Sequence, residues 1–139
     1  MINELPGPSL TQVFRLHAVP GAPLDLGDRL IVPFVGGRFT GPELNGNLVP
    51  EGSADWRSVL PDGTVVSRLW CTLRTDLGDL LHVRSRAVGH GAGAEGPLLR
   101  ATMRIQAASA RLAWVNRGVF VSVGARRGTG TTYETYLVS

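Results

Sequence analysis

Hydrophobic and polar residues alternate along several long stretches of the chain, with the period of a β-strand. In one stretch Leu69, Cys71 and Leu73 share a face opposite polar and aromatic residues. The next stretches show the same pattern, with apolar parities made of Leu81, Val83, Ser85 and Ala87, then Leu99, Ala101, Met103 and Ile105, then Val119, Val121 and Val123. One apolar face per strand is typical of an antiparallel sheet that covers a single interior.

Glycine and proline separate these stretches and predict turns between them. The earlier and central strands are predicted at Val13–Val19, Leu30–Val35 (an edge or a bend, because of Pro33), Arg38–Thr40, Leu44–Val49, Trp56–Leu60, Thr64–Thr75 and Leu80–Val88. The pair Gly36-Gly37 is suited to a bulge or corner. Residues Gly89–Pro97 lack alternation and predict a loop, either a plain hairpin connection or a lid over a barrel mouth.

Roughly eight to ten strands of this kind, with at most one helical turn near Ala107–Val115, predict an all-β fold. We expect a single closed antiparallel β-barrel, because closure removes the exposed edges of a sheet. The whole chain of 139 residues fits one domain, with residues 1–10 as a loosely ordered N-terminal segment. A chain of this length buries enough surface for a stable core without disulfides or metals.

The composition is that of a globular protein, with 43% hydrophobic and 18% charged residues. The single cysteine, Cys71, has no partner for an internal disulfide, and its parity favours burial. The first residues have neither a basic segment nor an apolar one, so no signal peptide is predicted. No apolar stretch is long enough for a transmembrane helix. We therefore expect a cytoplasmic protein without a membrane partner.

The formal net charge is +3, and all 14 basic residues are arginines. Avoidance of lysine, together with many alanines, glycines and valines, indicates a high-GC genome such as that of an actinobacterium. The arginines are spread along the chain, and the only adjacent pair is Arg126-Arg127. This distribution does not favour nucleic acid as a partner.

An ordered series of short motifs carries a resemblance to a known family. It consists of Ile31-Val32-Pro33, Gly36-Gly37, Phe39-Thr40-Gly41-Pro42, Leu44-Asn45-Gly46, Pro50, Ala54-Asp55-Trp56, Pro61-Asp62-Gly63, Asp76-Leu77-Gly78, Val83-Arg84, Trp114-Val115-Asn116-Arg117, Phe120-Val121 and Tyr136. The series resembles the small bacterial domains of unknown function numbered 3237, over roughly Val13 to Val138. The resemblance implies a barrel of lipocalin size and no established reaction. Trp70, Ser85 and the short loop at Gly89–Pro97 depart from the family pattern.

Motifs for metal, nucleotide or nucleophilic chemistry are absent from the sequence. His17, His82 and His90 are far apart and have no metal-ligand spacing. There is no Gly-x-Ser-x-Gly elbow, and Gly128-Thr129-Gly130 is a turn rather than a phosphate loop. We expect no metal and no cofactor.

The candidate site is therefore built from aromatic residues and a few polar ones. The expected catalytic residues are Asp55, Arg84 and Asn116, and the expected ligand-binding residues are Phe39, Trp56, Trp70, Trp114, Tyr133 and Tyr136. Aromatic walls with a few polar groups are typical of a small-molecule pocket. In particular, we expect Trp56, Trp114 and Tyr136 in one cavity, with Asn116 and Arg84 as polar contacts. The alternatives are ordinary core packing, a turn role for the Asp55 carboxylate, and a plug at Trp114-Val115-Asn116 in which Asn116 binds loop backbone.

Three functions are compatible with these features. The first is a cofactor-independent cyclase or isomerase that holds an apolar polyketide-type intermediate in a reactive conformation inside the barrel. The second is a non-catalytic binding protein for a hydrophobic small molecule, and the third is a structural domain with a filled core.

A homodimer is a further expectation. Six arginines occupy the less apolar parity of neighbouring strands: Arg68, Arg74, Arg84, Arg86, Arg100 and Arg104. Like charges directly opposed on a sheet repel. Acidic groups of a second subunit pairing through sheet faces, or a ligand carboxylate, would offset them, and the alternative is a solvated arginine-rich surface.

Overall fold

The computed structural model describes residues 4–93 and 96–139, and in these residues it contains nine β-strands and one 3-10 helix. The elements are β1 (Leu10–Pro20), β2 (Leu24–Asp25), β3 (Leu30–Thr40), β4 (Gly46–Val59), β5 (Val65–Thr75), β6 (Leu80–Gly93), β7 (Gly96–Ala107), η1 (Ala110–Arg117), β8 (Val119–Arg127) and β9 (Gly130–Val138).

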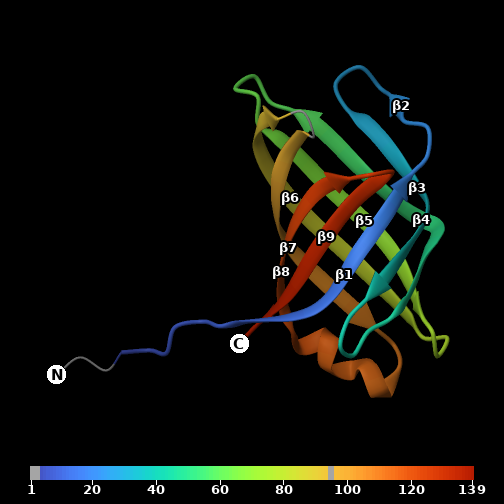
Figure 1. Ribbon diagram of the computed structural model, residues 1–139, viewed down its shortest axis with the longest axis vertical. Coiled ribbons are helices and arrows are strands. Elements are labelled where there is room, and N and C mark those ends of the chain that lie inside the picture. The colour runs from blue at the N-terminus through green and yellow to red at the C-terminus, as the bar shows by residue number, and fades with distance from the viewer. Residues whose placement is uncertain (1–3, 94–95) are drawn as a thin grey trace.

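All strand pairs are antiparallel, and the sheet order is β1-β9-β8-β7-β6-β5-β4-β3-β2. An additional pairing of β1 with β3 closes eight of these strands into a barrel, and the short β2 pairs only with β3 (Figure 1). The predicted closed antiparallel barrel is therefore confirmed.

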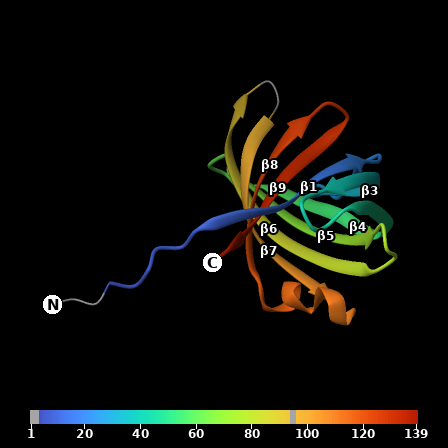
Figure 2. The same cartoon turned by 60° about the horizontal axis from the view of Figure 1, so that its bottom comes forward.

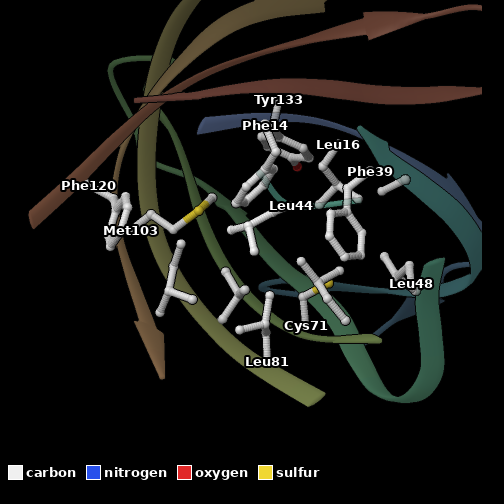
Figure 3. Packing of buried hydrophobic residues seen from close by; sticks show 14 of the residues in the cluster. Phe14, Leu16, Phe39, Leu44, Leu48, Cys71, Leu81, Met103, Phe120 and Tyr133 are labelled. Carbon is white, nitrogen blue, oxygen red and sulfur yellow. The ribbon is translucent and has the colours of Figure 1, made fainter. Parts of the chain in front are cut away.

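The alternation in β5, β6 and β7 sets the inner face as predicted. Cys71, Leu73, Leu81 and Val83 are completely buried, and their neighbours of opposite parity lie on the outside. These residues belong to one large apolar cluster inside the barrel (Figure 3). Phe14 and Phe39 meet in it edge to face, with ring centroids 5.8 Å apart. A large part of the interior is thus filled by side chains.

Strand β8 is inverted relative to the prediction. Phe120, Ser122 and Gly124 face the interior, whereas Val119 is 64% exposed. Valine is common in strands because its branched side chain fits a pleated surface, whether that surface is buried or not. The valines at alternate positions of β8 therefore indicate a strand, but they do not show which face of that strand is buried.

Two bulges change which residues face inward. The register shifts between Pro33 and Arg38 in β3, as predicted for Gly36-Gly37, and again between Val49 and Ala54 in β4. At the first bulge Gly37 has φ 154°, and a Cβ there would lie 2.3 Å from the carbonyl oxygen of His17. The predicted edge or bend at residues 30–35 is instead part of the continuous strand β3.

The second bulge determines the chemistry of the interior. Before it Leu48 is buried, and after it the buried residues of β4 are Ser53 and Asp55. The inward parity therefore changes from even to odd numbers within one strand. As a result Asp55 points inward and Trp56 points outward.

The two ends of the barrel differ. At one end η1 packs across the opening, with Val115 completely buried and the Trp114 ring 6.3 Å from the Phe120 ring (Figure 2). The opposite end carries β2 and the β8–β9 hairpin (Figure 1). The loop predicted at residues 89–97 is largely strand, because β6 runs to Gly93 and β7 begins at Gly96. The rest of that loop, residues 94–95, lies outside the described residues.

Residues 4–9 extend away from the barrel before β1, and Leu5 is 90% exposed (Figure 1). Backbone hydrogen bonds between Ser9 and Ser139 join the two ends of the chain where the barrel begins. Among the helical residues that the structure describes, none forms a helix long and apolar enough to cross a membrane.

Candidate active site at the open end of the barrel

Asp55 is the charged residue at the centre of the site. Its side chain has no exposure to solvent, and among the described residues it is the only buried charged one. The Nε of Arg57 donates to Oδ2 at 2.5 Å, and Oγ of Ser67 donates to Oδ1 at 2.5 Å. Burial of an unpaired carboxylate is costly. These two charge-assisted hydrogen bonds therefore stabilise the Asp55 carboxylate inside the barrel.

Arg57 lies two residues after Asp55 on the same face of β4. Its side chain remains 29% exposed, so the guanidinium reaches from the buried carboxylate toward solvent. Burial lowers the pKa of Arg57, but the charge of Asp55 and its hydrogen bond outweigh burial, and the pKa is raised overall. The arginine is therefore a permanent cation held by an internal anion.

Tyr133 on β9 is the third member of the group. It is 2% exposed, and in the described part of the chain its hydroxyl is the one buried side-chain polar atom without a hydrogen-bond partner. Burial raises the pKa of this phenol, the Asp55 carboxylate raises it further, and the Arg57 guanidinium opposes them. The phenol is therefore neutral at physiological pH, and its hydroxyl lies near the Arg57 guanidinium without a well-formed hydrogen bond.

Asp55 and Arg57 line a cavity of about 360 Å³ at the open end, which we call the mouth pocket. Its walls come from the segment after β1, from the start of β3 and from the β8–β9 hairpin. The apolar part includes Leu30, Val32 and Phe34, and Arg126 contributes a second cation. The mouth pocket thus combines apolar walls with a few charged groups, as small-molecule sites do.

Small side chains continue around the interior beside Arg57. Following the cross-strand pairs from Arg57 around the sheet leads to Ser67, Ala87, Ala101, Ser122 and Thr135. All five are buried. The large apolar residues lie instead toward η1, whose Val115 belongs to the main core cluster. The barrel is therefore filled toward η1 and lined by small and polar groups beside Arg57.

The structure places three of the predicted site residues inside the barrel. Asp55 and Tyr133 belong to the same polar group, as shown by the electrostatic effect of one on the other. Phe39 is completely buried and packs against Phe14 in the core cluster. It lies in the filled region and not among the residues that line the mouth pocket.

Other predicted residues lie on the outer wall. Trp56 is 41% exposed and Trp70 is 44% exposed. Arg84 is also exposed, and its guanidinium lies over the Trp70 ring, 4.3 Å from the centroid. Tyr136 alternates with the inward-facing Tyr133 and Thr135, and it is partly buried opposite Gln12 and Val121.

Trp114 and Asn116 belong to η1 at the closed end. The Oδ1 of Asn116 accepts from the Ala107 amide at 2.8 Å, and its Nδ2 donates to the Ala107 carbonyl at 2.9 Å. This arrangement matches the plug that we considered as the alternative. The expectation that Trp56, Trp114 and Tyr136 share one cavity is wrong, because the β4 bulge turns Trp56 outward and Trp114 packs against the core.

Arg57 and Ser67 are site residues that sequence reasoning missed. Residues two apart on a strand lie on the same face, so the spacing Asp-x-Arg predicts that Arg57 lies beside Asp55. Ser67 carried no signal of its own, since only the pairing of β4 with β5 brings it to Asp55.

Groups of three or more histidine, cysteine or acidic side chains in metal-binding arrangement do not occur in the described residues. Cys71 is buried, and burial raises its pKa to about 12. A protonated, buried thiol is a weak nucleophile. Within the part of the chain that the structure describes, the charged groups of the mouth pocket are the Asp55 carboxylate and the guanidinium groups of Arg57 and Arg126.

The fold and this pocket define a small closed antiparallel barrel with a charged interior site at one end. The chain belongs to the family described as "Protein of unknown function (DUF3237)", whose model matches residues 8–138. No curated protein sequence matches the chain.

Solved structures share the fold at low identity. A protein of unknown function from Clostridium acetobutylicum is similar with a TM-score of 0.90 and 19% identity, covering 98% of this chain and 100% of that one. A β-barrel-like protein from Acinetobacter baumannii has a TM-score of 0.88 and 23% identity, covering 98% and 99%. An enzyme from Penicillium herquei has a TM-score of 0.75 and 16% identity, covering 99% and 100%.

Proposed function

We propose that the protein is a cofactor-independent isomerase or cyclase for an apolar, carbonyl-bearing small molecule of polyketide type. The observation that carries this proposal is the Asp55–Arg57 ion pair at the mouth pocket. The Asp55 carboxylate is fully buried next to a cavity that Asp55 and Arg57 line, which combines a base with a water-poor environment. The enzyme from Penicillium herquei adds a catalytic relative of the same fold, by analogy of fold alone.

In the proposed reaction, the exposed side of the Arg57 guanidinium binds the carbonyl oxygen of the substrate. Asp55 accepts a proton from the adjacent carbon, and the electron pair of that C–H bond forms the C=C bond of an enolate. The negative charge moves to the oxygen beside Arg57, where a fixed cation in a desolvated site stabilises it.

Two outcomes follow from the enolate. Asp55 returns the proton to a different carbon, which gives an isomer, or the enolate attacks a carbonyl carbon of the same molecule, which closes a ring. In the second case the π pair of that carbonyl moves to its oxygen, and the resulting alkoxide takes the proton from Asp55. In both cases the electron count of the substrate is unchanged, so no oxidant or reductant is required. The apolar walls at Val32 and Phe34 hold the remaining chain in place.

A second candidate is a binding protein without catalysis. Both oxygens of Asp55 already accept hydrogen bonds, and the carboxylate is shielded from solvent. This geometry favours a role for Asp55 in orienting Arg57 for ligand binding. The two candidates share a pocket but differ in what Asp55 does.

Deuterium exchange separates them. We would incubate the protein with apolar 1,3-diketones and enones in D₂O and follow exchange at the acidic carbon by NMR, and binding by thermal shift. The enzyme hypothesis predicts binding with exchange above the buffer rate, loss of exchange in Asp55→Asn with binding retained, and loss of both in Arg57→Gln. Arg15→Gln, outside the pocket, is the matched control.

Binding without exchange would favour the second candidate. If no compound of this class shifts the melting temperature of the wild-type protein, both candidates fail.

A further inference from the structure

The mouth pocket shares a lining residue with a depression on the outer wall of the barrel. Arg57, which lines the mouth pocket, also lines this depression of about 190 Å³, together with Trp56 and Arg68. Trp56 and Arg68 in turn line a cleft of about 610 Å³ whose other wall is Trp70. Neighbouring depressions thus share lining residues and follow one another as a path along the barrel wall.

The path ends in a groove of about 640 Å³ that Arg68 and Trp70 share with the cleft. This groove crosses the outer face of β5, β6, β7 and β8, and Arg84, Arg86 and Arg104 also line it. We call the whole path from Arg57 to Arg104 the outer track.

The arginines of the outer track are unbalanced in charge. Arg68 pairs directly with Arg86 across β5 and β6, and Arg84 pairs with Arg104 across β6 and β7. Like charges directly opposed on neighbouring strands destabilise a sheet.

No carboxylate of the described residues forms an ion pair with these four arginines, in contrast to Arg15, Arg38 and Arg111, which each have one. A ligand with several negative charges would offset the repulsion between these arginines. Guanidinium groups match phosphate oxygens in geometry, because two N–H donors reach two oxygens.

The tryptophans of the cleft add a second kind of recognition. Trp70 lies opposite Ala54, and Trp56 lies opposite Arg68, so the two indoles are diagonal neighbours across β4 and β5. Both are more than 40% exposed. Exposed indole faces stack with planar aromatic groups such as nucleobases.

We propose that the outer track binds the nucleoside-phosphate tail of a tethered substrate. In this arrangement phosphates lie along Arg68, Arg84 and Arg104, and a base stacks on Trp56 or on the face of Trp70 that the Arg84 guanidinium leaves free. The tether passes Arg57 into the mouth pocket. The placement of the reacting group in the mouth pocket depends on the proposed function. Binding of the nucleoside-phosphate tail depends only on the residues of the outer track.

The test uses ADP as the probe, with inorganic pyrophosphate as the probe for charge alone. Binding to the full chain is measured by calorimetry and by quenching of tryptophan fluorescence. We expect ADP to bind more tightly than pyrophosphate and to quench fluorescence. We expect the Arg84→Gln/Arg104→Gln variant to lose at least tenfold in ADP affinity. We expect the Trp56→Ala/Trp70→Ala variant to reduce ADP affinity to that of pyrophosphate. Arg15→Gln, which is off the track, should bind as the wild type does.

Several results would overturn the proposal. Equal affinity for ADP and pyrophosphate, unaffected by Trp56→Ala/Trp70→Ala, would leave only a nonspecific anion surface. Absence of ADP binding at millimolar concentration would reject the site. A dimer in sedimentation that dissociates in Arg84→Gln/Arg104→Gln would assign the track to acidic groups of a second copy.

Failure here is distinguishable from failure of the proposed function. Asp55→Asn should abolish deuterium exchange and leave ADP affinity unchanged, because Asp55 is not among the residues that line the outer track. A change in ADP affinity in this variant would contradict the division between the two sites.

Discussion

Gly124 on β8 and Tyr133 on β9 face each other across the sheet, and the Tyr133 ring occupies the space that a side chain on Gly124 would need. A Cβ at Gly124 would lie 2.7 Å from two ring carbons of Tyr133. The absence of a side chain at one residue therefore places the phenol of the other beside Asp55 and Arg57.

Gly124→Ala should consequently destabilise the protein. Overpacking of this kind costs about 1–3 kcal/mol, because the ring has to leave its position. Urea unfolding measures the loss, with Gly36→Ala as the control, since a Cβ at Gly36 meets nothing within 4 Å. Equal stability of the two variants would show that the ring moves freely and that Gly124 does not position it.

Tyr133→Phe should fold at least as stably as the wild type. The substitution removes a buried hydroxyl that has no partner, and such a group costs about 1–3 kcal/mol when buried. Urea unfolding is again the measurement, and Tyr136→Phe, on the outward parity of the same strand, is the control. A clear loss of stability in Tyr133→Phe would mean that the hydroxyl has a partner inside the protein.

The thiol of Cys71 should make the fold less stable in alkali. Burial raises its pKa to about 12 in the folded state, whereas an exposed thiol titrates near pH 8.5. Between these values the unfolded chain loses the proton and the folded chain keeps it, so stability is complete below about pH 8.5 and falls as pH rises.

From pH 8 to 9.5 we expect the unfolding free energy to drop by about 1 kcal/mol through this group. Denaturant titrations at the two pH values test this, with Cys71→Ala as the comparison. The variant should lose less stability over the same interval. An identical slope in the two proteins would assign the pH dependence to other groups.

The fold was largely predictable because its strongest signal is local. Leu69, Cys71 and Leu73 alternate with polar residues, and burial of one face requires that period. Glycine at residue 37 marked a bulge for an equally local reason, since a side chain there would meet the backbone of β1. In β8 the same reasoning failed, because valine suits an exposed strand as well as a buried one.

The site was less predictable because it depends on register. Asp55 was identified, but the bulge in β4 decides that it faces Ser67 and that Trp56 faces solvent. The bulge has one conspicuous glycine, Gly52 with φ 72°, and nothing in the residues around it fixes how many positions the strand gains. Contacts such as that of Arg57 with Asp55 follow only once this number is known.

The plug at η1 affects how a small molecule could enter and leave the barrel. Because Val115 is seated in the core at the η1 end, the mouth pocket is the opening to Asp55 that the described residues show, past Arg57 and the β8–β9 hairpin. Under the proposed function, a product that becomes rigid or ring-shaped inside would have to leave through the opening that admitted its flexible precursor. The width of that opening would then set the largest ring that the protein releases. The β8–β9 hairpin at Gly128–Thr131 is where substitutions could widen it.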